Sequence, residues 1–119
     1  MKYTNEHEWL RNESDHVVVG ITAYATEQLG DIVFVELPEA DTAVSKNDEV
    51  VVIESVKAAS DILAPLDGTI IEVNSALSED PTLVNTDPLG KGWFFKMKLS
   101  DPAELDGLMD EAAYNEMIA

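Results

Sequence analysis

Short apolar runs separated by turn residues recur along the chain. Five of them are rich in β-branched or aromatic residues and lie at 17–19, 32–35, 50–53, 69–73 and 93–99. Runs of this length and spacing are typical of strands in an all-β domain. The last run is the clearest, because Trp93, Phe95, Met97 and Leu99 alternate with Lys96 and Lys98. Alternation with a period of two predicts a half-buried antiparallel strand.

The stretch 51–65 predicts a β-hairpin, because one apolar strand is followed by a short polar break and a second strand. The break, Ser55-Val56-Lys57-Ala58, contains no glycine or asparagine, which disfavours the primed turns that need a positive φ. A type I turn centred on Val56 and Lys57 is sterically allowed. The sequence therefore places Lys57 at an exposed tip between small residues.

Two helical pieces are predicted among the strands. Thr22 is a suitable N-cap for a helix over 23–29 that ends at Gly30. Asp101 followed by Pro102 resembles a second helix start. An apolar stripe at i, i+3, i+4 and i+7 follows it and consists of Leu105, Leu108, Met109 and Ala112. This stripe predicts a C-terminal helix that lies on the sheets.

One glycine and the two tryptophans have predicted structural roles. Gly68, in the segment Leu66-Asp67-Gly68-Thr69, is expected to supply a positive φ to a turn. Trp9 and Trp93 are predicted to be core residues, because the chain has only 2 Trp, 3 Tyr and 3 Phe with which to fill its interior.

Composition narrows the class of protein. A chain of 119 residues that is 45% hydrophobic predicts one domain over 1–119. A net charge of −17 repels phosphate, so we expect no nucleic-acid partner and no anionic membrane surface. The absence of cysteine excludes a disulfide, a thiolate metal site and a cysteine nucleophile.

The N-terminus lacks the apolar segment of a signal peptide, and no apolar run approaches the length of a membrane helix. A cytoplasmic protein is therefore expected.

The chain shows little catalytic equipment of its own. It contains no glycine-rich phosphate loop and no paired-histidine metal motif. His7 and His16 are therefore predicted to have non-catalytic roles. Carboxylate pairs could be drawn from Glu6, Glu8, Glu79 and Asp80, but a chain with 24 acidic residues contains such pairs by chance, and most of these acids are expected to be solvated. From the residues alone, Lys57 is one more surface lysine.

A longer comparison changes the interpretation of Lys57. The segment Glu54-Ser55-Val56-Lys57-Ala58-Ala59-Ser60-Asp61 resembles the lipoyl-lysine hairpin of the glycine cleavage system H-protein family. The resemblance continues in order through 7–9, 19–22, 29–38, 64–65, Gly68, 72–74, 87–88 and 92–93. It implies an all-β-dominated fold, a flattened β-barrel or sandwich of two antiparallel sheets with a lipoyl/biotinyl-carrier-like hairpin. Short helices and a C-terminal helix complete that fold.

The resemblance also implies a carrier that is not itself an enzyme. Lipoate would be attached covalently to Lys57 by a lipoate ligase or a lipoyl/octanoyl transferase. The arm would then take an aminomethyl group from the pyridoxal-phosphate-dependent glycine decarboxylase to the tetrahydrofolate-dependent aminomethyltransferase. Dihydrolipoamide dehydrogenase, an FAD enzyme, would reoxidise it.

Family positions further imply roles for particular residues. Glu54 and Gly68 correspond to positions that attachment enzymes recognise, although Gly68 also suits a turn. Ser55, Val56 and Ala58 form the hairpin tip around the lysine. Glu8 and Asp61 correspond to a cleft that receives the loaded arm, and their alternative interpretation is two solvated acids. Asn47 stands where a glycine is common, and asparagine tolerates the same positive φ.

Four other classes of protein share some of these features. A biotin carrier usually places its lysine between methionines, whereas Val56 and Ala58 flank Lys57 here. A lipoyl domain of a 2-oxo-acid dehydrogenase is usually shorter and joined to other domains by linkers. A lipoyl donor in a lipoate relay would share every feature of the hairpin. An unmodified acidic protein-binding module would bind a basic partner through charge, with strong salt dependence.

Overall fold

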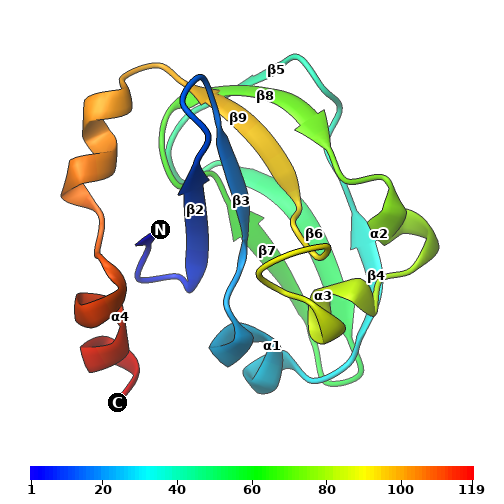
Figure 1. Cartoon of the computed structure of the whole chain (residues 1–119). Helices are drawn as coiled ribbons and strands as arrows, with labels where there is room; N and C mark the ends of the chain where they lie inside the picture. Colours follow the sequence, from blue (N-terminus) through cyan, green and yellow to red (C-terminus); the bar gives the residue numbers. More distant parts are fainter.

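Nine strands form two antiparallel sheets in the computed structural model, which describes all residues 1–119. The larger sheet has the order β1 (Lys2–Tyr3), β2 (Glu8–Asn12), β3 (Val17–Ile21), β9 (Phe95–Leu99), β8 (Gly68–Val73) and β5 (Thr42–Val44). The smaller sheet has the order β4 (Ile32–Glu36), β6 (Glu49–Ser55) and β7 (Ala59–Leu63). Figure 1 shows the two sheets stacked as a sandwich, which confirms the predicted fold class.

The main core lies between the sheets. It is a cluster of 19 buried residues drawn from both of them, including Val17, Val19, Ile53 and Met97. A second cluster lies on the outer face of the larger sheet and contains Tyr3, Trp9, Val18 and Tyr114. Alternate residues of β3 therefore enter different clusters, which is why all five residues of that strand are buried. Of the two tryptophans, Trp9 is fully buried and Trp93 is half-buried.

The helices are short. They are α1 (Ala23–Leu29), α2 (Ala76–Glu79), α3 (Leu83–Thr86), the 3₁₀ helix η1 (Pro102–Gly107) and α4 (Glu111–Ile118). The prediction for α1 is confirmed at both ends, because the Thr22 side chain accepts a hydrogen bond from Ala25 N and Gly30 ends the helix with φ 79°. None of the helices has the length and apolar character needed to cross a bilayer.

The predicted continuous C-terminal helix is wrong. After η1 the chain becomes extended at Leu108, and Met109 forms a β-bridge with Tyr3 before Asp110 caps α4. Two backbone hydrogen bonds join Tyr3 and Met109, with N···O distances of 2.8 and 3.1 Å. These bonds satisfy the N–H and C=O groups of Met109 outside a helix. The predicted stripe is therefore split, with Leu105 in η1, Leu108 and Met109 in the extended segment and Ala112 in α4.

The prediction of a positive φ at Gly68 is also wrong, since Gly30 is the only glycine in that region of backbone space. Gly68 begins β8 and pairs with Leu99 of β9. A methyl group added at Gly68 would lie 2.4 Å from Lys98 O and 3.2 Å from Leu99 Cα. The position needs glycine because the neighbouring backbone passes too close for a side chain. By contrast, the expected positive φ at Asn47 is confirmed, at 75°.

Candidate functional site

Lys57 lies at the tip of the hairpin formed by β6 and β7. Register pairs Glu54 with Ala59, and Ser55 N donates to Ala58 O at 2.9 Å, which closes the turn. Neither Val56 nor Lys57 has a positive φ, which excludes the primed turns disfavoured on sequence grounds. The Ser55 hydroxyl accepts from the N–H groups of Lys57 and Ala58 at 3.2 and 3.1 Å. A serine-stabilised turn therefore gives the tip a fixed backbone.

The side chain of Lys57 is free of charge partners. Lys57 and Val56 are exposed, Val56 to 67%, and no ion pair in the structure includes Lys57. The aliphatic stem lies against the C-terminal end of α1, since a methyl group added at Gly30 would lie 3.4 Å from Lys57 Cε. The amine at the end of this stem is accessible to another protein.

The chain after α1 supports the tip from below. Val56 N donates to Asp31 O at 3.0 Å. Asn85 of α3 holds the same segment, because its amide donates to Gly30 O at 2.9 Å and accepts from Ile32 N at 2.8 Å. Figure 1 shows α1 and α3 at the same end of the sandwich as this tip. Hydrogen bonds thus hold the backbone of the hairpin tip beneath the exposed side chain of Lys57.

Glu8, which the family resemblance assigns to a cleft, is a buried polar residue, so its alternative interpretation as a solvated acid is wrong. It lies in β2 and is 3% exposed. Thr4 Oγ1 donates to Glu8 Oε1 at 3.0 Å, and Leu63 N donates to Oε2 at 3.2 Å. Burial raises the pKa of Glu8 to about 7, and the charge of Glu6 adds to the rise, while the two hydrogen bonds oppose it. Nothing in the polar sequence around Glu8 signals this burial.

An open cleft of about 340 Å³ lies beside Glu8. Its walls come from the start of the chain, the end of β7 and the segment between η1 and α4, and include Glu6, Lys46, Leu63, Leu108 and Met109. One carboxyl group able to gain or lose a proton near neutral pH therefore faces a half-apolar cleft. Such a cleft suits a small cationic group on an apolar arm.

The other predicted site residues are distributed as follows. Glu54 points outward from β6, because the buried positions of that strand are Val51 and Ile53. Gly68 is buried in the other sheet and is not at the tip. Asp61 is exposed on β7, two residues before Leu63 and on the same face of the strand, and it does not line the cleft of Glu8.

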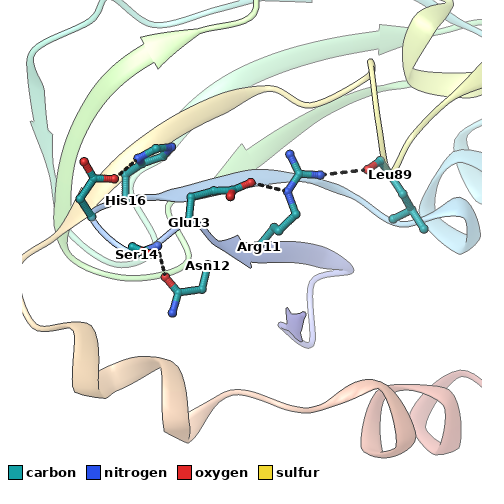
Figure 2. A network of polar contacts seen from close by, with 7 residues as sticks. Arg11, Asn12, Glu13, Ser14, His16 and Leu89 are labelled. Carbon is teal, nitrogen blue, oxygen red and sulfur yellow. Dashed lines mark hydrogen bonds and ion pairs between the residues drawn. The ribbon is translucent and has the colours of Figure 1, made fainter.

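The two histidines do not form a joint site. Figure 2 shows His16 in the β2–β3 turn, where its Nδ1 lies 2.6 Å from Asp15 Oδ1 and the contact lowers the pKa of Asp15. Arg11, near the end of β2, donates through Nε to Glu13 Oε1 in this turn at 2.8 Å. His7 contacts α4 instead, through Tyr114. No group of three or more histidine and acidic side chains in the chain is arranged to bind a metal ion.

Removing the charge of Glu8 is expected to change how stability depends on pH. The pKa of Glu8 is higher in the folded than in the unfolded protein, so the fold favours the neutral side chain. The resulting contribution to the free energy of unfolding is full below pH 4.5 and is lost as pH rises through about 7. Glu8→Gln keeps a neutral side chain, so it should be more stable than the wild type by about 2–3 kcal/mol at pH 8. The difference should nearly vanish at pH 4.5.

Urea denaturation of both proteins between pH 4.5 and pH 8.5 measures this difference. Glu27→Gln, at an exposed acid on α1, is the control and should give a difference that does not depend on pH in this way. A constant difference between Glu8→Gln and the wild type across the range would contradict the raised pKa.

Comparison with known proteins gives consistent matches over the whole chain. The family model described as Glycine cleavage H-protein matches residues 1–119. A glycine cleavage system H protein of Xanthobacter autotrophicus is 57% identical over 118 residues, and one of Parvibaculum lavamentivorans is 52% identical over 118 residues. Each alignment covers 99% of this chain and 94% of the relative. The crystal structure of a glycine cleavage system H protein from Mycobacterium marinum has a TM-score of 0.88 at 39% identity, covering 98% of this chain and 94% of that one.

Proposed function

Because this chain belongs to the glycine cleavage H-protein family, whose members carry lipoate in the glycine cleavage system, we propose that Lys57 is its lipoyl attachment residue. The observation that carries the proposal is the exposed, unpaired amine at the tip of a rigid hairpin. A lipoyl group bound there supplies a dithiolane, whose sulfurs accept a one-carbon unit and take up electrons.

The residues of the tip have separate tasks in this proposal. Ser55 fixes the turn through its hydroxyl, while Val56 and Ala58 present no polar group that would hold the arm. Lys57 forms the amide and loses its charge, so nothing on the carrier retains the arm by ion pairing. The arm can then enter the active sites of different partner enzymes.

We place the resting end of the arm at the cleft of Glu8. An ammonium group arriving there meets a carboxyl group already desolvated by the fold, so the attraction is stronger than at an exposed acid. Asp61 of β7 does not line the cleft and would attract the ammonium group at longer range. Leu63 and Met109 supply apolar surface for an aliphatic chain and limit access of water.

The partners in this proposal are the glycine decarboxylase, the aminomethyltransferase, dihydrolipoamide dehydrogenase and a lipoate-attaching enzyme. With 24 acidic against 7 basic residues, the carrier favours partner surfaces that are basic around their active-site entrances. The partner enzymes perform the catalysis, and we propose that they meet the carrier in the cytoplasm.

Reconstitution with the three partner enzymes tests the role of the whole protein. The lipoylated chain, glycine, tetrahydrofolate and NAD⁺ should support steady release of CO₂ and ammonia. The shuttle role would be overturned if the lipoylated chain released no CO₂ or ammonia in a mixture in which a known carrier restores their release. Transfer of the lipoyl group from this chain to a 2-oxo-acid dehydrogenase domain would instead favour a relay.

Glu54 is expected to contribute to recognition by the attaching enzyme. It is exposed, three residues before Lys57 and on the outward face of β6. Glu54→Gln removes one charge-assisted contact with the attaching enzyme. We therefore expect kcat/KM for lipoylation to fall about tenfold. Glu49→Gln is the matched control, because Glu49 is an exposed acid at the other end of the same strand. Equal rates for both variants would show that Glu54 has no role in recognition.

A further inference from the structure

The hydroxyl of Tyr114 joins three segments that are far apart in the sequence. Its oxygen lies 2.7 Å from Thr22 Oγ1, the N-cap of α1, and 2.8 Å from His7 Nδ1. Tyr114 is 3% exposed and is the only buried residue of α4. Burial raises its pKa, so the hydroxyl keeps its proton and can donate one hydrogen bond and accept another.

His7 has a conformation that needs support. Its φ is 67°, a left-handed value that costs a non-glycine residue about 1 kcal/mol or more. Two backbone contacts help to hold it, since His7 N donates to Thr4 O at 3.2 Å and Thr22 N donates to His7 O at 3.0 Å. The imidazole adds the bond to Tyr114 and lies 4.8 Å, between ring centroids, from Tyr24.

The residue after His7 is Glu8, so the backbone angle of His7 sets the direction in which β2 begins. Any relaxation of His7 from its left-handed conformation turns the following peptide group. Glu8 would then leave its bonds with Thr4 and Leu63, which meet the carboxyl group at 3.0 and 3.2 Å. The orientation of Glu8 therefore depends on what holds the His7 ring.

We propose that Tyr114 is a positioning residue for Glu8, whose hydroxyl fixes His7 in its left-handed conformation and so keeps the carboxyl group at the cleft. This inference rests on the proposed role of that cleft in receiving the lipoyl arm. The C-terminal segment is thus linked to the cleft in two ways, because Leu108 and Met109 line it and Tyr114 contacts His7, the residue before Glu8.

The packing of α4 can be separated from this polar role. The Tyr114 ring stacks on Tyr3 with centroids 4.7 Å apart and an interplanar angle of 12°. Phenylalanine preserves this stack and the apolar contacts of the second core cluster. Tyr114→Phe therefore removes the hydrogen bonds and little else.

The test follows the titration of Glu8 by carboxyl ¹³C NMR in the full-length protein without lipoate. In Tyr114→Phe the carboxyl group of Glu8 is released from its bonds and becomes more hydrated. The pKa of Glu8 should therefore fall by about one unit or more toward the ordinary value of a glutamate. Tyr24→Phe is the matched control, because Tyr24 also contacts His7 but its hydroxyl has no hydrogen-bond partner in the chain. Its Glu8 titration should equal that of the wild type.

Two rates complete the experiment. Lipoylation of Lys57 in Tyr114→Phe should stay within about twofold of the wild type, because the tip does not contact this network. Glycine cleavage in the reconstituted system should fall severalfold. A merely structural role of the hydroxyl would lower the melting temperature without moving the titration of Glu8 in the folded protein.

An unchanged Glu8 titration in folded Tyr114→Phe overturns the inference. If that variant does not fold, His7→Ala removes the same hydrogen bond without altering α4 and should give the same shift, and no shift there has the same meaning. Failure of the proposed function is distinct, since it is seen as missing lipoylation of the wild type, while the Glu8 titration needs no lipoate.

Discussion

Replacing Lys57 by arginine is expected to abolish lipoyl attachment and, with it, all support of glycine cleavage. Arginine keeps the positive charge and the length of the side chain, but its guanidinium does not form the amide. Because Lys57 is exposed and has no charge partner, the fold should be unaffected. Incubation with lipoate ligase, lipoate and ATP, followed by reconstitution with the partner enzymes, measures both losses.

Lys91→Arg is the control for this substitution, since Lys91 is an exposed lysine far along the chain from the hairpin. It should be lipoylated and should function as the wild type does. A Lys57→Arg protein that still supports glycine cleavage would contradict the assignment of the attachment residue. A variant with a lowered melting temperature would show instead that the lysine contributes to the fold.

Gly68→Ala is expected to destabilise the protein by about 3 kcal/mol. The added methyl group would lie 2.4 Å from Lys98 O and 3.2 Å from Leu99 Cα, which are backbone atoms of β9 and cannot rotate away. The β8–β9 pairing must therefore shift. For a domain of this size the loss corresponds to a fall in Tm of about 10 °C or more, measured by thermal denaturation.

Gly107→Ala provides the comparison, because a methyl group at Gly107 meets nothing within 4 Å and the residue has no positive φ. Its stability should stay within about 0.5 kcal/mol of the wild type. The pair also separates two explanations of Gly68. If Gly68→Ala keeps its stability yet is lipoylated slowly, the glycine acts in recognition and the steric explanation is wrong.

Local patterns predicted much of the fold. The alternation of β9 is visible in the residues from Phe95 to Leu99, and the whole of α1 follows from Thr22 and Gly30. Such signals depend on neighbours within a few positions, which a single sequence contains. The hairpin tip could be predicted for the same reason, because the absence of glycine and asparagine restricts the turn that can carry Lys57.

Long-range contacts account for what the patterns missed. Glu8 is buried among residues distant in sequence: Leu63, 55 positions away, donates to its carboxyl group, and Leu108 and Met109 form a wall of the adjoining cleft. The predicted C-terminal helix was divided because Met109 pairs with Tyr3, at the other end of the chain. The sequence predicts a positive φ at Gly68, whereas glycine is needed there because the backbone of β9 passes too close for a side chain. None of these contacts leaves a signal in the residues adjacent to it.

The mass of the intact protein after incubation with lipoate ligase, lipoate and ATP, followed by peptide mapping, tests directly whether Lys57 carries the lipoyl group. We expect one lipoyl group per chain, located on Lys57 and on none of the other five lysines. No addition to a folded protein, with the ligase active on a second substrate, would contradict it, and so would attachment at a different lysine.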